Sequence, residues 1–404
     1  MTTTAAPAAP PAASAAHFGV AVFALAMGTF AIGTTEFVTM GLLPEIAAGV
    51  DVSIPAAGHL ISAYALGVVV GAPLLASLGA RLPRRGLLVA LMLTYAVFNA
   101  ASALATNYHL LALARFLDGL PHGGYFGVAS LVAANLASPD RRGRAVALVM
   151  LGLSIANVVG VPATTWMGQH LGWRSAYWAA AVLSLATVAL TLAFVPRFPG
   201  NAEASGRREL TAFAKPQVWL TLLAGAVGFG GMFAVFSYIA PIVMESGGLP
   251  RSAVPVFLLA FGLGMVFGTW LAGELADWSI LRSLLGSAVG MGAALLLFAL
   301  VMPWGWWALP LAFLITTIGS VLVVNLQLRL MDVAGEAQTL GAAMNHAALN
   351  VANALGAWLG GLVIAAGFGY LSTALVGVGL SVLGFGVLLL SAVLHRRGAA
   401  ALTG

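Results

Sequence analysis

Hydrophobic residues are grouped along this chain into long blocks, and a short polar connection separates each block from the next. An α-helix crosses the ~30 Å hydrocarbon core of a bilayer with about 20 apolar residues, and it satisfies its own backbone groups there. The blocks therefore predict twelve membrane-spanning helices. The predicted spans are residues 18–44, 55–79, 86–106, 109–137, 145–170, 174–196, 217–245, 251–276, 282–302, 307–331, 338–366 and 370–394.

A polar stretch divides these spans into two sets of six. We expect an N-terminal six-helix bundle at 18–196, a cytoplasmic linker at 197–216 and a C-terminal six-helix bundle at 217–397. Residues 1–17 are rich in Ala, Pro and Thr and hold no Lys or Arg, which predicts a disordered cytoplasmic tail instead of a signal peptide. Residues 398–404 are expected to form a second cytoplasmic tail. The predicted fold class is an all-α integral membrane protein.

The two halves carry matching residues at a constant distance of 197 along the chain, among them Gly67 with Gly264 and Gly71 with Gly268. A Gly-xxx-Gly spacing lets two helices approach closely, so we expect tight helix contacts at both pairs. Because six spans is an even number, both copies cross the membrane in the same direction. The repeat predicts two parallel-related bundles around a central cavity.

Basic residues gather in every second connection between the spans, whereas the connections between those hold only Arg174 and Arg251. Lys and Arg are enriched on the cytoplasmic side of membrane proteins. Both termini are therefore expected in the cytoplasm, and the location is expected to be the cell (inner or plasma) membrane, crossed many times.

Composition narrows the class of protein further. The chain is 61% hydrophobic and 7% charged, too apolar for a soluble domain, and its net charge of +5 lies in short loops that do not suit nucleic acid. It has no cysteine, which excludes disulfides and thiolate metal sites. No zinc-binding His pair, Gly-x-Ser-x-Gly elbow or phosphate-binding loop is present, so we expect neither an enzyme nor an ATP-driven pump. The expected partners are a small molecule, protons and lipid, with no metal or cofactor, and the protein is expected to be a monomer.

Glu36 is the only charged residue of the first span. A carboxylate in hydrocarbon costs at least about 2.5–3.5 kcal/mol on insertion scales, so such a residue is a functional candidate by default. We interpret Glu36 as the principal proton-accepting group. The alternative is a structural pairing with a neighbouring helix.

Span 4 holds three polar residues on one helix face, Arg115, Asp118 and His122, at positions i, i+3 and i+7. Counted at ~1.5 Å per residue from the outer end, Arg115 lies within one helical turn of the depth of Glu36. Arg115 is interpreted as the fixed cation that sets the proton affinity of Glu36. Asp118 is either a second proton site or a permanent partner of Arg115, and His122 is either a proton site or a hydrogen-bonded packing residue.

The second half lacks these charges, because Phe233 and Ala312 stand 197 residues after Glu36 and Arg115. Proton handling is therefore assigned to the first bundle and substrate contacts largely to the second. For Asn157 and Asn353 the alternative is structural hydrogen bonding between helices, and for the span-7 aromatics it is contact with lipid. The candidate cavity residues are Phe37, Met40, Asn157, Phe233, Phe236, Tyr238, Asn325, His346 and Asn350, the last two forming a stripe with Asn353.

Several motifs resemble those of the major facilitator superfamily over residues 18–397. The loop after span 2 reads Ala76-Ser77-Leu78-Gly79-Ala80-Arg81-Leu82-Pro83-Arg84-Arg85, where the family has an acid in place of Ala80, and the second copy, Gly273 to Arg282, keeps that acid as Asp277. Span 4 carries Arg115-Phe116-Leu117-Asp118-Gly119, and span 5 carries Gly160-Val161-Pro162. With Thr35-Glu36-Phe37, this pattern is similar to twelve-span drug/proton antiporters, closest to the sugar-efflux and chloramphenicol-resistance branch.

The resemblance implies that spans 1 and 4 lie side by side around the cavity, so that Glu36 and Arg115 can meet. It also implies a cytoplasmic latch in the outward-open state, for which the matching residues are Arg81, Arg84, Arg85, Asp277 and Arg282. The expected function is a secondary active transporter that exports a drug-like compound or sugar in exchange for protons by alternating access. The alternative is a facilitator or proton symporter for sugars or nucleosides.

Overall fold

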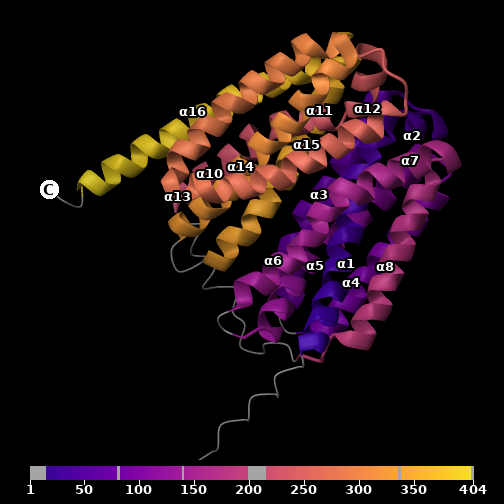
Figure 1. The fold of residues 1–404 in the computed structure, drawn as a ribbon, viewed down its shortest axis with the longest axis vertical. Coiled ribbons are helices and arrows are strands. Elements are labelled where there is room, and N and C mark those ends of the chain that lie inside the picture. The colour runs from indigo at the N-terminus through magenta and orange to yellow at the C-terminus, as the bar shows by residue number, and fades with distance from the viewer. Residues whose placement is uncertain (1–14, 80–81, 139–140, 199–214, 335–337, 402–404) are drawn as a thin grey trace, which may run out of the picture.

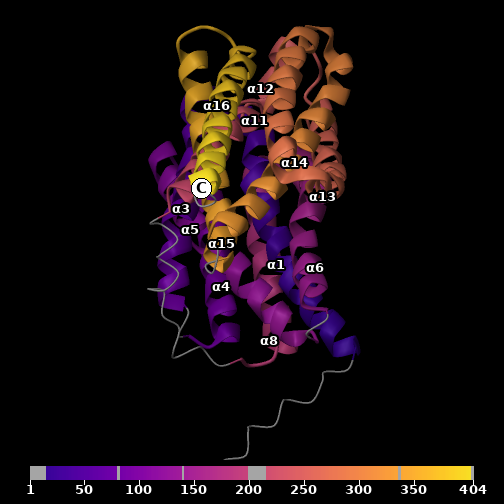
Figure 2. The same cartoon turned by 90° about the vertical axis from the view of Figure 1, so that its left-hand side faces the viewer.

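The computed structural model describes residues 15–79, 82–138, 141–198, 215–334 and 338–401, and within these ranges the chain is helical with no strand. Its helices form two bundles, drawn from indigo to magenta for the first half and from orange to yellow for the second (Figure 1). In Figure 2 most of the orange and yellow helices lie above the indigo and purple ones, and the two groups overlap around α1, α3 and α15. The predicted tail at 1–17 lies mostly outside the described residues, as does most of the linker at 197–216.

The first bundle begins at α1 and ends at α8. Its elements are α1 (Ala15–Gly41), α2 (Leu43–Gly49), α3 (Ile54–Gly79), α4 (Arg84–Leu104), α5 (Tyr108–Leu136), α6 (Arg142–Ile155), the π-helical turn η2 (Ala156–Gly160), α7 (Val161–Leu171) and α8 (Arg174–Phe194). The second bundle comprises α10 (Pro216–Gly228), α11 (Gly230–Phe236), α12 (Ile239–Pro241), the π-helical turn η4 (Ile242–Ser246), α13 (Ala253–Val301), the 3₁₀ turn η5 (Met302–Ala308), α14 (Leu309–Ala334), α15 (Gln338–Ala365) and α16 (Ser372–Ala401).

In the described part of the chain, nine helical stretches are long and apolar enough to cross a membrane. One of them, Ala253–Val333, has 81 residues and covers three predicted spans. Another predicted span, which forms α5, is absent from the nine and carries Arg115 and Asp118. The helical, membrane-spanning class is therefore confirmed, whereas the number twelve and the side of the termini stay predictions.

The chain reverses twice within the 81-residue stretch. Ser279, inside the 49-residue α13, has an extended conformation with φ −176° and ψ 112°. A straight helix of that length would run about 74 Å at 1.5 Å per residue, more than twice the ~30 Å core. Gly305 in η5 has φ 63°, a left-handed conformation that glycine adopts without strain. These breaks lie where the sequence predicts connections between spans.

The predicted close contacts at the paired glycines are confirmed in both bundles. A Cβ on Gly67 would lie 2.0 Å from the Phe116 carbonyl oxygen, so α3 and α5 touch backbone to backbone. In the second bundle a Cβ on Gly264 would lie 2.2 Å from the Phe313 carbonyl oxygen, between α13 and α14. The same scaffold contact therefore recurs 197 residues later.

The two bundles meet at the end that carries the connections α2–α3 and α7–α8, and they diverge from this junction (Figure 1). The Ser62 hydroxyl donates to the Ala354 carbonyl oxygen at 3.1 Å, and the Gln169 amide donates to the Arg251 carbonyl oxygen at 3.0 Å. Tyr238 packs on Gly58, where a Cβ would lie 2.1 Å from its hydroxyl. We refer to this region below as the bundle junction.

Candidate functional site

An ion pair is buried in the first bundle on α5. Arg115 Nη1 lies 2.8 Å from Asp118 Oδ2, and both side chains are fully inaccessible to solvent. Asn99 of α4 donates to the other carboxylate oxygen of Asp118 at 2.7 Å. Both oxygens of this carboxylate are therefore hydrogen-bonded, which is what a buried charge requires. Asp118 adopts the arrangement that the sequence left open as a partner of Arg115.

Two tyrosine rings surround the guanidinium of Arg115. Its Cζ lies 4.3 Å from the ring centroid of Tyr64 on α3 and 5.5 Å from that of Tyr177 on α8. Arginine is attracted to the face of an aromatic ring, most strongly where water is excluded. The Tyr177 hydroxyl is 2.9 Å from Thr39 Oγ1, which ties this environment to α1.

A chain of hydroxyl groups connects His122 to α1. Tyr64 Oη lies 2.9 Å from His122 Nδ1 and 3.0 Å from Tyr95 Oη, and Tyr95 donates to the Ile32 carbonyl oxygen at 3.3 Å. A carbonyl only accepts and a hydroxyl has one proton. Tyr64 must therefore donate to Tyr95, and His122 Nδ1 must donate to Tyr64. This order leaves His122 Nε2 as the nitrogen that can accept a proton.

Glu36 lies on α1 and is 7% exposed. Among the described residues, no salt bridge or hydrogen bond joins its carboxylate to Arg115, whose ion-pair partner is Asp118. Thr34 and Thr35 donate to carbonyl oxygens of their own helix, so their hydroxyls are engaged elsewhere. The predicted meeting of Glu36 with Arg115 is thus not formed in this conformation. Glu36 also forms no ion pair with any other described residue, so the alternative of a structural pairing is not seen in this conformation either.

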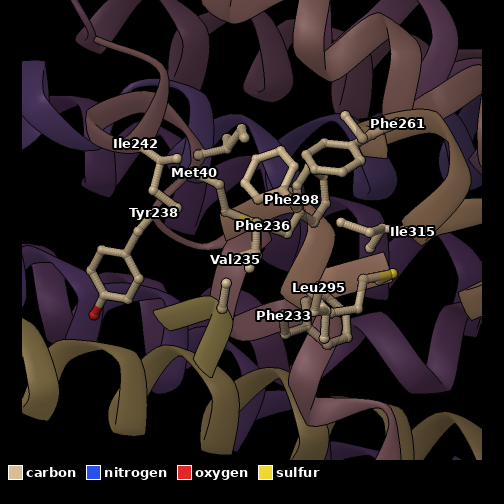
Figure 3. Close-up of a cluster of buried hydrophobic side chains, with 14 of the residues drawn as sticks. Met40, Phe233, Val235, Phe236, Tyr238, Ile242, Phe261, Leu295, Phe298 and Ile315 are labelled. Carbon is tan, nitrogen blue, oxygen red and sulfur yellow. The ribbon is translucent and has the colours of Figure 1, made fainter. Parts of the chain in front are cut away.

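The residue after Glu36 belongs to the bundle junction. Phe37 lies 6.4 Å from Phe233 and 5.4 Å from Phe236 between ring centroids, and Phe236 lies 4.8 Å from Phe261. Figure 3 shows Phe233 and Phe236 with Met40 in one buried cluster. All of these side chains are buried, as is Tyr238, so the alternative of lipid-facing aromatics in span 7 is wrong.

The amides of the second bundle mostly bind their own helices. Asn350 donates to the His346 carbonyl oxygen at 3.0 Å and Asn325 to that of Val321 at 2.9 Å. Asn157, in the first bundle, donates to Leu153 at 2.9 Å. No hydrogen bond to a neighbouring helix is found for Asn157 or Asn353 among the described residues, so that alternative is not supported by this conformation.

A histidine of each bundle contacts the same phenylalanine. The ring of Phe126 on α5 lies 5.0 Å from that of His122 and 5.7 Å from that of His346 on α15. His346, predicted to face the cavity, is therefore brought to the first bundle, one aromatic ring away from the hydroxyl chain of Tyr64.

The predicted cytoplasmic latch is separated in this conformation. Arg81 lies outside the described residues. The Arg85 guanidinium donates to the Leu192 carbonyl oxygen, and the backbone N–H of Arg84 donates to the Phe198 carbonyl oxygen. Asp277 is exposed, and Arg282 lies 5.4 Å from the ring of its neighbour Trp278. No ion pair joins these residues within the described ranges.

Sequence reasoning missed the polar residues that complete the site, namely Tyr64, Tyr95, Asn99 and Tyr177. Asn99 carried a usable signal, because a buried amide inside the otherwise apolar span 86–106 requires a partner. The tyrosines carried none, because tyrosine is also common in apolar packing and at membrane interfaces.

The sequence matches the family model of the Major Facilitator Superfamily over residues 25–345. It is 41% identical over 353 residues to "Inner membrane transport protein YdhP" of Escherichia coli (strain K12), which covers 86% of this chain and 90% of the relative. It is 38% identical over 260 residues to the "Chloramphenicol resistance protein" of Streptomyces lividans, covering 63% of this chain and 66% of the relative.

Among solved structures, the chain resembles that of a mutant of the nucleoside transporter NupG. The TM-score is 0.73 over 93% of this chain and 99% of the other, with 14% sequence identity. At that identity the likeness concerns the fold alone. It agrees with the two-bundle architecture described above.

Proposed function

The chain belongs to the Major Facilitator Superfamily, and from this premise we propose that it exports a small organic molecule in exchange for protons. Members of this family are membrane transporters and not enzymes, and so is this chain. Its similarity to a chloramphenicol resistance protein supports export as the direction of transport. Transport would proceed by alternating access, in which the two bundles rock about a central site.

One observation carries this proposal: Glu36 is an acid without an ion-pair partner among the described residues, placed where the two bundles meet. Asp118 is held by Arg115 and Asn99, so the Arg115–Asp118 pair keeps its charges together. Glu36 has no such partner, and its neighbour Phe37 contacts Phe233 of the second bundle. A carboxyl in this position can hold a proton or oppose a bound substrate, which is the requirement for exchange.

Arg115 and His122 are proposed to act around Glu36 as the bundles move. When they rock, Arg115 can exchange Asp118 for Glu36, since its Nε and Nη2 have no hydrogen-bond partner in the present arrangement. Glu36 would then release its proton, because a nearby cation favours the ionised carboxylate. His122 Nε2 and the tyrosine hydroxyls offer a path for that proton through the first bundle.

With both termini in the cytoplasm, the bundle junction faces the outside and the structure is inward-facing. The absence of native cysteine makes this orientation directly testable. We expect Asp51→Cys, in the exposed connection after α2, to react in intact cells with a membrane-impermeant maleimide. Arg141→Cys, in the connection before α6, is expected to react only after the cells are opened. The reverse pattern would invert the proposed orientation.

Uphill transport of chloramphenicol in proteoliposomes under an imposed pH gradient tests the exchange. The wild type is expected to accumulate the drug against its gradient, and Glu36→Gln is expected to lose this while retaining downhill exchange. Asp51→Asn serves as a control, because it removes an exposed carboxylate outside the spans. Proton-driven accumulation that persists in Glu36→Gln would contradict the role of Glu36 as the proton-accepting group.

Symport of a sugar or nucleoside is the second candidate, since one mid-membrane carboxyl also suits inward coupling. The two functions differ in the sign of the coupling. Under exchange, substrate and proton move in opposite directions, so in vesicles with the protein in known orientation the substrate moves toward the acidic side. Under symport, the substrate moves with the proton, away from the acidic side.

A further inference from the structure

Asn353 on α15 has an unusual side chain. It is 1% exposed, and neither its Nδ2 nor its Oδ1 has a hydrogen-bond partner in the described chain. Buried amides are normally hydrogen-bonded, and an unpaired one lowers stability. Such an amide keeps its hydrogen-bonding capacity free for a ligand.

Asn350, one turn earlier, offers a second unpaired atom. Its amide binds the carbonyl oxygen of His346, and because a carbonyl only accepts, the bound atom must be Nδ2. Its Oδ1 is therefore the free atom, and it is buried without a partner in the described chain. Together Asn350 and Asn353 present two acceptor oxygens and one amide donor.

The direction of these side chains follows from the contacts of their neighbours. Gly356 packs on the Gly230 carbonyl oxygen of α11, and the Ala354 carbonyl oxygen accepts from Ser62 of α3. At 3.6 residues per turn, the face that holds Asn350 and Asn353 lies between those two directions. His346, on the same face, contacts Phe126 of the first bundle. The stripe thus points into the bundle junction.

The surroundings of the stripe are apolar and, among the described residues, lack a free cation. A Cβ on Gly356, one turn after Asn353, would lie 2.9 Å from the Phe233 carbonyl carbon, so α15 packs here against α11, the helix that carries Phe233 and Phe236. Arg115 is paired with Asp118. An anionic ligand would have to compete with Asp118 for Arg115, whereas an uncharged ligand would lose little on desolvation.

We propose that Asn350 and Asn353 form a subsite that recognises hydroxyl or amide hydrogen-bond donors on an uncharged substrate with one apolar face. The aromatic cluster receives the apolar face when the bundles part, and the amide oxygens accept from the donors. This inference rests on the proposed transport function, but it concerns recognition and not proton coupling.

Equilibrium binding to purified protein in detergent, without a pH gradient, tests the subsite. The probes are chloramphenicol, which has an aryl ring, an amide N–H and two hydroxyls, its di-O-acetyl ester and its anionic hemisuccinate. Uridine and tri-O-acetyluridine form a second pair. We expect at least one donor-bearing compound to bind more tightly than its ester, and the hemisuccinate to bind more weakly than chloramphenicol.

Asn353→Leu is expected to reduce the affinity for the donor-bearing compound about tenfold, the size of one lost hydrogen bond, and to leave the ester unaffected. Its Tm without ligand should stay equal or rise, because the unpaired amide is removed. Asn345→Leu is the matched control. Asn345 is a buried amide of the same helix that donates to the Val323 carbonyl oxygen of α14, so its loss should lower Tm and leave the affinity ratio unchanged.

The inference is overturned if neither donor-bearing compound binds more tightly than its ester. It is also overturned if Asn353→Leu lowers Tm as Asn345→Leu does without changing the affinity ratio, because Asn353 would then be structural. Either result leaves the role of Glu36 untouched, since that role is read from uphill transport under a pH gradient.

Discussion

The two bundles share a scaffold but differ in what fills it. In the first, Arg115 and Asp118 form a buried pair beneath Tyr64. The positions 197 residues later are Ala312, Ile315 and Phe261, and all three belong to a buried hydrophobic cluster. The glycine contacts at Gly67 and Gly264 are the same in both. A membrane bundle therefore needs no internal charge to pack, so the charges of the first bundle call for a functional explanation.

The largest expected effect comes from breaking the ion pair. Arg115→Ala leaves the Asp118 carboxylate buried without its cation, and removing one partner of a buried pair typically costs about 3–5 kcal/mol. We expect a correspondingly lower free energy of unfolding in detergent and loss of proton-coupled transport.

The double variant Arg115→Ala with Asp118→Ile copies the second bundle at both positions. It is expected to recover much of the lost stability, because no uncompensated charge remains, while transport stays inactive. A double variant as unstable as Arg115→Ala would contradict the view that the charges serve function and not packing.

The shared scaffold is tested by Gly67→Ala and Gly264→Ala. Each new methyl group would meet a backbone carbonyl oxygen, at 2.0 Å in the first bundle and 2.2 Å in the second. Overpacking of this kind costs about 1–3 kcal/mol. We expect similar losses of unfolding free energy in both variants, with Gly86→Ala, at a site where a Cβ meets nothing within 4 Å, as the neutral control. Clearly unequal losses would show that the repeat is not equivalent here.

Removing one hydroxyl is expected to have a smaller effect. Tyr64→Phe makes this position resemble Phe261 and deletes the links to His122 and Tyr95, each of which contributes about 1 kcal/mol. The free energy of unfolding should fall by about 1–2 kcal/mol for the two links together, with the cation–π contact to Arg115 retained. If His122 Nδ1 carries the proton as inferred, the proton NMR signal of that N–H should shift in the variant. If the wild type instead shows no Nδ1–H signal for His122, then Nδ1 accepts from Tyr64 and the hydroxyl chain runs in the opposite order.

The smallest effect concerns Glu45, on α2 outside the first span, whose counterpart in the second bundle is the buried Ile242. Burial raises the pKa of Glu45, opposed by its own backbone N–H and by Arg251. A raised pKa means that the folded protein holds the proton more tightly, so stability is highest below the unfolded pKa of 4.5 and falls as pH rises above it. Glu45→Gln should therefore raise Tm at pH 7 and not at pH 4. An equal gain at both values would argue against this titration.

Much of the architecture could be predicted from the sequence. The spans, the division near residue 197 and the 197-residue repeat follow from runs of consecutive residues, because length and apolar composition decide whether a helix can cross a bilayer. Glu36, Arg115 and Asp118 were identifiable because a charge within such a run is costly wherever it points.

The tertiary structure decided which partners these residues have. In hydrocarbon both the lipid-facing and the buried faces of a helix are apolar, so the sequence does not reveal how each helix is rotated. The rotation of α3 and α4 brings Tyr64 to His122 and Asn99 to Asp118, and the rotation of α15 buries Asn353 without a hydrogen-bond partner among the described residues. Asp118 was expected either as a second proton site or as the partner of Arg115, and it is the partner here, because the residue one turn away on the same helix is within reach in any arrangement of the bundles.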